Sequence, residues 1–316
     1  MNLTQSFFYK FKKLSHSFYK RPLKINCIAE KKVNFNKLHP FKANNFPISG
    51  PLPWLDQQNY QFHIDNKLEN KIITIEEAKY CKEWAENGFV IFENFFNYNE
   101  LNSLICELDE YAIINLENPY SELSNLRFQD IHFKIKSLNK LMHDPRLLKI
   151  AEILLGIKVK PFQSLFFPYG SGQNAHSDSI HMTTYPLGYL LATWIALEDI
   201  KTQAGPLFYY PKSHRLPFVF SHQLQIPNYL KKMSTQEVYE QFYEPKIQSI
   251  IKSQNLEQKI VLAKKGDLIF WHANLIHGGS PRENLILTRK SIACHYFAKK
   301  VFCYHDLSGS KAHRMN

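Results

Sequence analysis

The sequence has few cysteines, and those it has show no pairing pattern. Its five cysteines are spread along the chain without repeated spacing: Cys27, Cys81, Cys106, Cys294 and Cys303. Disulfide frameworks and cysteine-based zinc sites both need cysteines at short, regular intervals. The sequence therefore predicts neither of them, and a reducing compartment, the cytoplasm, fits it best.

Long apolar runs are absent as well. No run approaches the roughly 20 residues that span a bilayer, and the first residues lack the continuous apolar core of a secretory signal. A membrane-spanning protein and a secreted one are both disfavoured. With 316 residues, of which 44% are hydrophobic and 21% charged, the chain has the composition of a globular protein with a sizeable core.

Acidic residues are in the minority, because 28 Asp and Glu stand against 39 Lys and Arg, for a net charge of +11. Such an excess is compatible with nucleic acid, an anionic membrane or a negatively charged substrate. Much of it is lysine scattered along the chain, so general solvation explains it better and no nucleic-acid partner is expected. The charge mildly favours a small-molecule substrate that is anionic or lipid-linked.

Two histidine-containing segments, about a hundred residues apart, carry the candidate chemistry. The first contains His176 and Asp178, and the second runs from Asp267 to His277. Side chains at positions i and i+2 of a strand leave the same face, so His176 and Asp178 can point inward together. With His277 they would offer two imidazoles and one carboxylate, the ligand set that non-haem Fe(II) oxygenases use while leaving three coordination positions open.

The first motif alone is weak evidence, because a second His-x-Asp occurs at His63 and Asp65. The copy at 176–178 differs because an ordered series of segments follows it. These segments are Trp194-Ile-Ala-Leu-Glu-Asp199, Ala204-Gly-Pro-Leu207, Pro211-Lys-Ser-His-Arg215, Lys265-Gly-Asp267, His277-Gly-Gly279 and Arg289.

In this order and spacing the chain resembles the phytanoyl-CoA dioxygenase family of Fe(II)- and 2-oxoglutarate-dependent oxygenases, from about Gly88 to about Ser308. The string Arg289 to Tyr296 is similar to the family's arginine strand. The resemblance implies that His176, Asp178 and His277 are the catalytic iron ligands, with Fe(II), 2-oxoglutarate and O2 as cofactor and co-substrates.

The same resemblance implies that Arg289 binds the far carboxylate of 2-oxoglutarate, since a guanidinium can make two parallel hydrogen bonds to a carboxylate. Gln163 and Trp194 match positions that line the co-substrate pocket, although both residue types are often simply packing. His272 is a rival of His277 for the third metal position.

One position departs from the family pattern. Gly279 stands where a hydroxyl residue is often found, so that contact would be missing or supplied by Ser280.

The implied reaction is hydroxylation of a substrate C–H bond with release of succinate and CO2. Asp178 favours hydroxylation, because related halogenases carry a small residue there. The alternatives are a zinc enzyme, since zinc accepts the same three ligands, and a non-catalytic protein on the same fold. A zinc enzyme would leave Arg289 and the flanking segments unexplained. A non-catalytic protein would be indicated by loss of an iron ligand, and no ligand is lost in this sequence.

Capping signals predict three helices that would support one face of a sheet. The first runs from Thr74 to about Asn87 with Gly88 as its stop, the second follows Asn97, and the third runs from Asp144 to Gly156. Nothing in these helices requires chemistry.

Short strands with turn residues between them predict an antiparallel sandwich or barrel. They are expected at 89–92, 159–167, 189–197, 207–210, 259–262 and 268–271. The resemblance implies the same fold class, mainly β with supporting α-helices: a double-stranded β-helix (a jelly roll, cupin-like).

The expected organisation is an N-terminal part, residues 1–72, and an oxygenase domain, residues 73–316, with a helical insertion at about 216–258. The insertion is polar and carries a helix from Ser234 to Glu244. It lies where a lid or a substrate-recognition element could sit.

Residues 1–21 combine an apolar stripe at helical spacing with lysines and arginine. They form either an anchor lying on an acidic membrane, which would make the protein membrane-peripheral, or an accessory helix or frayed terminus. Residues 22–72 are expected to be an irregular arm.

Overall fold

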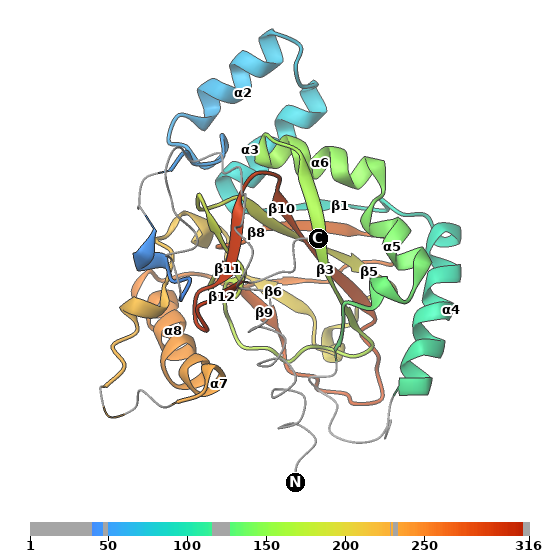
Figure 1. The fold of residues 1–316 in the computed structure, drawn as a ribbon. Helices are drawn as coiled ribbons and strands as arrows, with labels where there is room; N and C mark the ends of the chain where they lie inside the picture. The colour runs from blue at the N-terminus through green and yellow to red at the C-terminus, as the bar shows by residue number, and fades with distance from the viewer. Residues whose placement is uncertain (1–39, 47–49, 116–126, 228, 230–232, 312–316) are drawn as a thin grey trace, which may run out of the picture.

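The largest sheet forms the centre of the molecule (Figure 1). The computed structural model describes residues 40–46, 50–115, 127–227, 229 and 233–311, and the basic segment 1–21 lies outside these ranges. Six antiparallel strands make up the large sheet, in the spatial order β1 (Phe89–Phe92), β8 (Leu268–His272), β5 (Leu190–Ala196), β10 (Ser291–Ala298), β3 (Val159–Phe167) and β2 (Phe128–Gln129).

Two three-stranded sheets complete the β structure. One has the order β7 (Lys259–Val261), β6 (Leu207–Tyr209), β9 (His277–Gly279), and the other β12 (Ser310–Lys311), β11 (Phe302–His305), β4 (Thr183–Tyr185). Buried side chains of the large sheet, among them Trp194 and Trp271, pack in one cluster with Leu207 and Val261 of β6 and β7. The two sheets therefore face each other across a shared interior, and the predicted jelly roll is confirmed.

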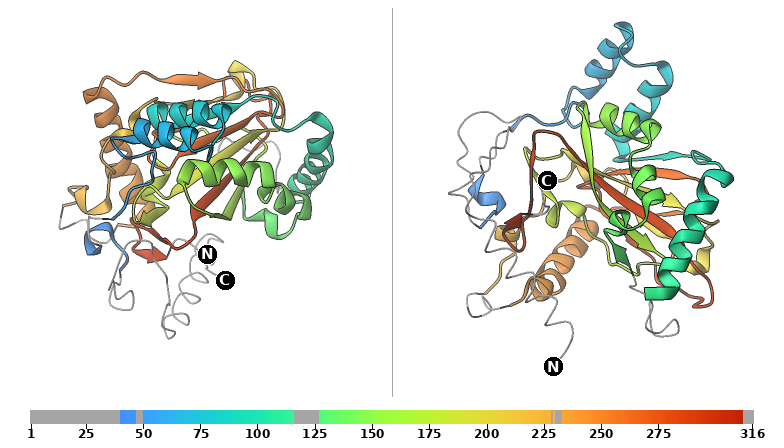
Figure 2. Two further views of the ribbon diagram at one scale, coloured as in Figure 1. Left: turned by 90° about the horizontal axis from the view of Figure 1, so that it is seen from above. Right: turned by 45° about the vertical axis from the view of Figure 1, so that its right-hand side comes forward.

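The outer face of the large sheet is covered by helices, as Figures 1 and 2 show. These are α3 (Ile75–Asn87), α4 (Tyr98–Asn115), α5 (Lys136–Met142) and α6 (Pro145–Leu155). Trp84 of α3 and Leu154 of α6 join Phe270 and Ile195 of the sheet in the main hydrophobic core. The helical layer thus backs the sheet from the side opposite the shared interior.

The predicted capping signals of these helices are confirmed. Thr74 and Glu77 form a reciprocal capping box at the start of α3, and Gly88 ends it in the left-handed conformation. Asn97 and Glu100 exchange hydrogen bonds in the same way before α4. Such side-chain caps satisfy backbone N–H groups that the first turn of a helix leaves unpaired.

Short 3-10 turns connect several of the elements. They are η2 (Ala43–Asn45), η3 (Ile131–Phe133), η4 (Asp178–Ile180), η5 (Thr202–Ala204), η6 (Ser213–Arg215) and η7 (Ser221–Gln223). The prediction of a strand through 176–178 was wrong in detail. His176 forms only an isolated β-bridge with His277, and the chain turns into η4 at Asp178.

The arm before α3 is not irregular throughout. Residues 60–69 form helix α2 (Tyr60–Glu69), so the expectation of an irregular arm was wrong there. The reason is that α2 has no apolar stripe to reveal it, since Ile64 is its one buried residue. The arm is also attached to the domain, because the Trp54 indole donates to Ile153 O at 2.8 Å.

The insertion contains a continuous helix, made of α7 (Thr235–Val238), the π-helical turn η9 (Tyr239–Tyr243) and α8 (Glu244–Ser253). It continues past Pro245, contrary to the predicted end at Glu244, because the π turn directly precedes α8 and Pro245 lies in the first turn of α8. Its buried side chains pack on Phe208 and Ile276 beside β6 and β9.

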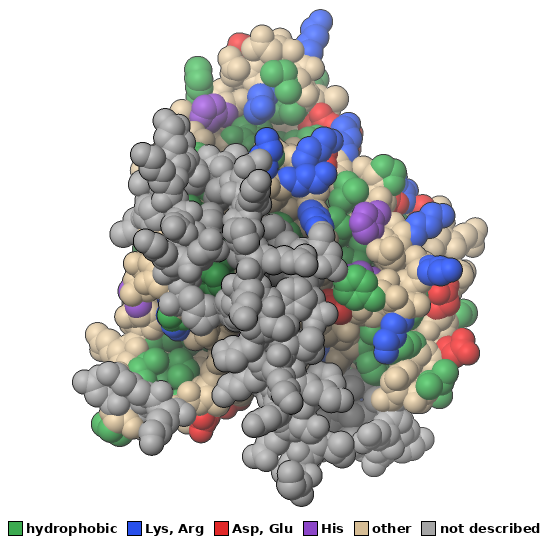
Figure 3. Space-filling view, in the orientation of Figure 1, with side chains coloured by type: hydrophobic (Ala, Val, Ile, Leu, Met, Phe, Trp, Pro, Cys, Tyr) green, Lys and Arg blue, Asp and Glu red, His purple; other side chains and the backbone are tan. Residues whose placement is uncertain are grey.

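Within the described ranges, every helix is too short or too polar to cross a lipid bilayer. On the face shown in Figure 3, Lys and Arg side chains are spread over the helical side of the molecule, with acidic side chains among them. This distribution is the one expected for general solvation of a basic chain.

Candidate metal centre

Three predicted ligands lie together in the interior between the facing sheets. Potential ligand atoms of His176, Asp178 and His277 all lie within 4.8 Å of one another, and all three residues are buried. The Nε2 atoms of both histidines are 3.8 Å from Asp178 Oδ1. This separation is too long for a hydrogen bond and leaves room for an ion between the three groups.

Backbone pairing brings the two histidines together. His176 and His277 exchange both of their N–H···O=C hydrogen bonds at 2.9 Å, and their rings lie with centroids 4.5 Å apart. The two residues are adjacent although about a hundred positions separate them in the sequence. Asp178 follows at the start of η4 and closes the group from the third side.

The tautomer of each histidine is fixed by the hydrogen bond that its Nδ1 atom makes to a backbone carbonyl. His176 Nδ1 lies 2.8 Å from Asn174 O, and His277 Nδ1 lies 3.0 Å from Leu275 O. A carbonyl oxygen can only accept, so both Nδ1 atoms carry the proton. Both Nε2 atoms therefore present a lone pair toward Asp178 Oδ1, as metal ligands must.

Asp178 is oriented through its second oxygen. The indole of Trp271 donates to Asp178 Oδ2 at 2.7 Å, and His295 Nε2 lies 3.5 Å from the same atom. Oδ1 is thereby left to face the two histidines. This is the arrangement of a carboxylate that would bind a metal through one oxygen while a neighbour holds the other.

The protonation states of the group suit a cation. Burial, followed by the neighbouring His277, lowers the pKa of His176 to about 4. For Asp178, burial acts to raise the pKa, but His277, His295 and His176 outweigh it and hold that pKa far below its usual range. At neutral pH the group therefore offers a neutral imidazole at His176 and a carboxylate at Asp178.

A single row of side chains crosses the inner face of the large sheet beside this group. Strand register places Trp271, Ala192, His295 and Gln163 side by side on β8, β5, β10 and β3. Gln163 is half-buried, whereas the other three are buried. The predicted pocket residue Gln163 thus lies on the same face as Trp271, which bonds to Asp178.

Arg289, the predicted co-substrate residue, lies just before β10 and is only 2% exposed. Its Nε and Nη1 atoms have no hydrogen-bond partner among the described residues. Its guanidinium carbon is 5.6 Å from the ring centre of Trp194 and 5.7 Å from that of Phe167. The predicted pair Arg289 and Trp194 is therefore in contact.

The charge of Arg289 survives its burial. Burial lowers the pKa of Arg289 to about 10, with nearby Glu198 acting in the opposite direction. The group stays protonated at neutral pH. A buried guanidinium with two unpaired nitrogens is costly unless an anion binds it, and a carboxylate is the ligand that matches its geometry.

The hydroxyl of another residue, Ser171, lies where a side chain at Gly279 would be. A Cβ atom built on Gly279 would overlap Ser171 Oγ. Gly279 pairs with Leu207, whose side chain belongs to the shared interior. Ser280 follows directly after the end of β9. The hydroxyl found next to the Gly279 position is that of Ser171.

His272, the rival ligand, is engaged elsewhere. Its Nε2 lies 3.1 Å from Asp56 Oδ2, and its Nδ1 accepts the backbone N–H of Asn274 at 3.0 Å. It is not part of the metal-ligand group of the described residues. Likewise, the second His-x-Asp motif lies on helix α2, where positions i and i+2 point in different directions.

Two residues of the site were not predicted from the sequence. Trp271 and His295 both lie in recognised strands, and aromatic side chains there are ordinarily core. Trp271 lies on a different strand from His295 and Gln163. That the three side chains share one face is visible only once the strand register is known. No local signal singles Trp271 out.

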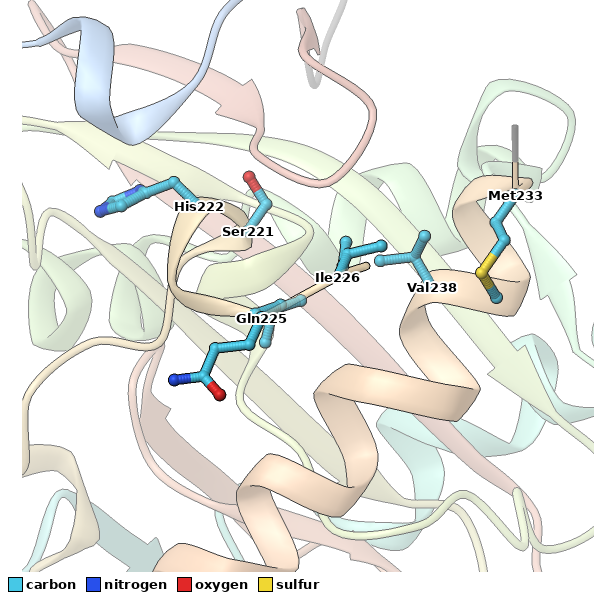
Figure 4. A pocket seen from close by; sticks show the side chains of 7 residues that line it. Ser221, His222, Gln225, Ile226, Met233 and Val238 are labelled. Atoms are coloured by element: carbon cyan, nitrogen blue, oxygen red, sulfur yellow. The ribbon is translucent and has the colours of Figure 1, made fainter. Parts of the chain in front are cut away.

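A separate cavity of about 420 Å³ lies in the insertion (Figure 4). It is lined by Ser221, His222, Leu224, Gln225, Ile226, Met233 and Val238. None of these residues belongs to the metal-ligand group or to the row beside it. The cavity is therefore distinct from the candidate metal centre.

Comparison of the sequence with protein families finds a match to the phytanoyl-CoA dioxygenase (PhyH) model over residues 84–290. The peroxisomal phytanoyl-CoA dioxygenase of Rattus norvegicus is 24% identical over 276 residues, covering 79% of this chain and 75% of the relative. The ectoine dioxygenase of Bordetella parapertussis is also 24% identical, over 244 residues, covering 71% of this chain and 78% of the relative.

Solved structures share the fold. The α-ketoglutarate-dependent epimerase SnoN from nogalamycin biosynthesis superposes with a TM-score of 0.54 at 18% identity, covering 72% of this chain and 85% of that chain. EctD from S. alaskensis with bound Fe gives a TM-score of 0.53 at 20% identity, covering 72% and 77%. At this identity the likeness extends to the fold alone.

Proposed function

The chain belongs to the phytanoyl-CoA dioxygenase family and is a 2-oxoglutarate-dependent dioxygenase, and from this premise we propose that it hydroxylates a C–H bond of a small-molecule substrate. His176, Asp178 and His277 would hold Fe(II). The proposal rests on one observation: the structure contains both this ligand group and Arg289, a buried cation whose Nε and Nη1 lack partners among the described residues.

Each group has a definite task in the proposed reaction. When bound, iron with O2 and 2-oxoglutarate supplies the oxidising power, and succinate and CO2 are released. The three ligands would hold the ion, and two histidines with one carboxylate would leave coordination positions open for the co-substrates. Arg289 binds the far carboxylate of 2-oxoglutarate, and Trp194 and Phe167 shield that ion pair from water, which strengthens it.

Arg289 also separates this function from a zinc hydrolase. A hydrolytic site needs the three ligands and one water molecule. It has no use for a second, buried cation flanked by Trp194 and Phe167. The presence of Asp178 supports hydroxylation rather than halogenation, because a carboxylate occupies the position that a halide would need.

The test of the proposed function is anaerobic. Fe(II) and then 2-oxoglutarate are added to wild type and to His176→Ala, and the visible absorption band of the iron chelate is recorded. The band is expected in wild type and should vanish in His176→Ala. Folded wild type that binds Fe(II) but gives no band with 2-oxoglutarate would contradict the proposal.

Ser171 is proposed to supply the hydroxyl that Gly279 lacks. Ser171→Ala should raise the half-saturating 2-oxoglutarate concentration by about tenfold, the value of one hydrogen bond to a charged group. Ser280→Ala is the matched control and should leave it unchanged. Because the two positions share one space, Ser171→Gly combined with Gly279→Ser should recover most of the loss, and a double variant worse than Ser171→Ala would contradict the assignment.

For the substrate we propose an anionic or lipid-linked small molecule. Arg127, an exposed residue directly before the edge strand β2, is one of the groups whose charge acts to lower the pKa of His176. A cation whose charge acts on the ligand group would attract an anionic substrate. Succinate release should therefore respond to phytanoyl-CoA and not to ectoine, the two compounds in the relatives' names. The opposite preference would contradict this part of the proposal.

A further inference from the structure

The segment that carries two of the metal ligands is held from behind by a tyrosine of the insertion. The hydroxyl of Tyr243 accepts the backbone N–H of Ser177 at 3.1 Å and lies 3.3 Å from Ser177 O and 3.1 Å from Ser177 Oγ. Ser177 is the residue between His176 and Asp178. One phenol thus contacts the backbone and the side chain of the residue that joins two ligands.

The contact continues into a buried chain of polar groups. Ser177 Oγ lies 2.8 Å from Ser179 Oγ, and Ser179 Oγ donates to Asn274 Oδ1 at 3.3 Å. Asn274 in turn donates to Leu216 O, at the start of the insertion, at 2.8 Å. Ser177, Ser179, Tyr243 and Asn274 are buried, so these hydrogen bonds are shielded from water and restrict one another. The ligand segment is therefore tied to the insertion at two points, its start at Leu216 and the π-helical turn that carries Tyr243.

Tyr243 reaches the ligand segment from the π-helical turn η9, on the helix that passes Val238 in Figure 4. Tyr239, at the beginning of the same turn, is also buried, and the two rings stack with centroids 5.2 Å apart. In the part of the chain that the structure describes, the Tyr239 hydroxyl makes no bond to residues 176–178. The turn therefore offers two similar tyrosines, of which one touches the ligand segment.

We propose that Tyr243 is a positioning residue of the metal centre, acting through Ser177 to set the relative placement of His176 and Asp178. The inference rests on the proposed function only in that these residues bind a metal. It assigns a task to the insertion: the insertion supports the ligands from the outer side of the small sheet, in addition to any contact with substrate.

The physical basis is the cost of leaving the ligand segment unsupported. Without the phenol hydroxyl, the buried N–H of Ser177 has no acceptor, and the segment can recover one only by moving. Metal binding is sensitive to such movement, because groups that orient ligands typically contribute about 10- to 100-fold to metal affinity. The two ligands flanking Ser177 would move together.

The experiment compares Tyr243→Phe with Tyr239→Phe. Each variant loses one buried hydroxyl and keeps its ring, so packing is preserved in both. The metal-free proteins are titrated with Co(II) under anaerobic conditions, and affinity is read from its visible bands. Urea unfolding of the metal-free proteins is measured in parallel, so that loss of fold is separated from loss of placement.

Tyr243→Phe is expected to weaken Co(II) binding by about tenfold or more, and Tyr239→Phe by less than about twofold. Fe(II) turnover should show a fall in kcat with little change in KM for 2-oxoglutarate, because Arg289 is untouched. Equal Co(II) affinities of Tyr243→Phe and wild type, or equal losses in both variants, would overturn the proposal.

Two further measurements keep the outcome decisive. Ser177→Ala removes one of the three contacts of the phenol and should weaken Co(II) binding less than Tyr243→Phe does. If Tyr243→Phe does not fold, unchanged Co(II) affinity in Ser177→Ala overturns the proposal. Wild type that binds no Co(II) would instead refute the metal site, and hence the proposed function itself.

Discussion

Two histidine–aspartate clusters lie on opposite sides of β8, the first in the shared interior and the second beside Trp84 of α3. They differ in the distance between their side chains. In one, His176 and His277 hold their Nε2 atoms 3.8 Å from Asp178 Oδ1. In the other, His272 Nε2 contacts Asp56 Oδ2 directly at 3.1 Å. The first has room for an ion, and the second is a closed hydrogen bond.

The difference originates at the Nδ1 atoms. In the first cluster each Nδ1 donates to a backbone carbonyl, so Nε2 keeps its lone pair. In the second, His272 Nδ1 accepts the N–H of Asn274, so Nε2 carries the proton and donates to Asp56. Identical residue types thus form a candidate metal-ligand group or a structural contact, depending on a backbone group two residues away.

The largest effect is expected when one histidine of each cluster is replaced by alanine and metal affinity is compared. His277→Ala should weaken Co(II) binding by more than about 100-fold, since a ligand matters more than the groups that orient it. His272→Ala should leave metal affinity unchanged but lower the free energy of unfolding by about 2 kcal/mol, because Asp56 loses its partner. Calorimetric titration and urea unfolding measure the two quantities. A large loss of metal affinity in His272→Ala would erase the distinction.

Arg289 extends the comparison to stability. Arg289→Gln should raise the half-saturating 2-oxoglutarate concentration by about 100-fold, the value of a paired buried guanidinium. Unlike His272→Ala, it should not destabilise the metal-free protein, because it removes a buried charge whose Nε and Nη1 have no hydrogen-bond partner among the described residues. Turnover against 2-oxoglutarate and urea unfolding test both statements. Strong destabilisation of Arg289→Gln would mean that the arginine has a structural partner.

A smaller effect is expected at the group that orients Asp178. Trp271→Phe keeps an aromatic ring in the strand and removes the 2.7 Å hydrogen bond to Asp178 Oδ2. Co(II) affinity should fall by about tenfold, whereas Trp194→Phe, which alters no ligand contact, should leave it unchanged. Similar affinities in Trp271→Phe and wild type would mean that Asp178 holds its orientation without the indole.

The smallest expected effect is a pH dependence of stability caused by His214, whose ring centre lies 5.5 Å from that of His272. Burial, followed by His272 and Arg215, lowers the pKa of His214 to about 2. Below about pH 6.5 the unfolded chain binds a proton there that the folded protein does not, so stability falls as pH decreases. Between pH 6.5 and 5.5 the metal-free protein should lose about 1 kcal/mol through this group.

That loss can be assigned by substitution. His214→Gln should reduce the loss of stability between pH 6.5 and 5.5 by about that amount, and replacement of the exposed His222 by Gln should not change it. If both variants retained the wild-type slope, the pH dependence would have to come from other buried histidines, such as His176.

The sequence predicted those features that depend on residues close together in the chain, such as the starts of helices. The caps at Thr74 and Asp144 predicted two helices because a cap acts within one turn. The order of His176, Asp178, His277 and Arg289 placed the candidate site, and the structure brings the three ligands into one group. Their roles in metal and co-substrate binding remain predictions.

What the sequence could not show depends on contacts between distant segments. Asp56 meets His272 across 216 positions, and Tyr243 meets Ser177 across 66. Strand register decides that Trp271 shares a face with His295. Helix α2 has one buried side chain, so it lacks the periodicity that reveals a helix. Each of these features is fixed by the fold as a whole.

The buried guanidinium of Arg289, whose Nε and Nη1 lack partners within the described ranges, affects how long the protein survives. A ligand that binds the folded state alone stabilises it in proportion to the logarithm of its concentration relative to its Kd. Under the proposed function, 2-oxoglutarate neutralises a charge that weakens the empty protein. Since partly unfolded molecules are the ones that proteases remove, the amount of enzyme in the cell would follow the supply of its own co-substrate.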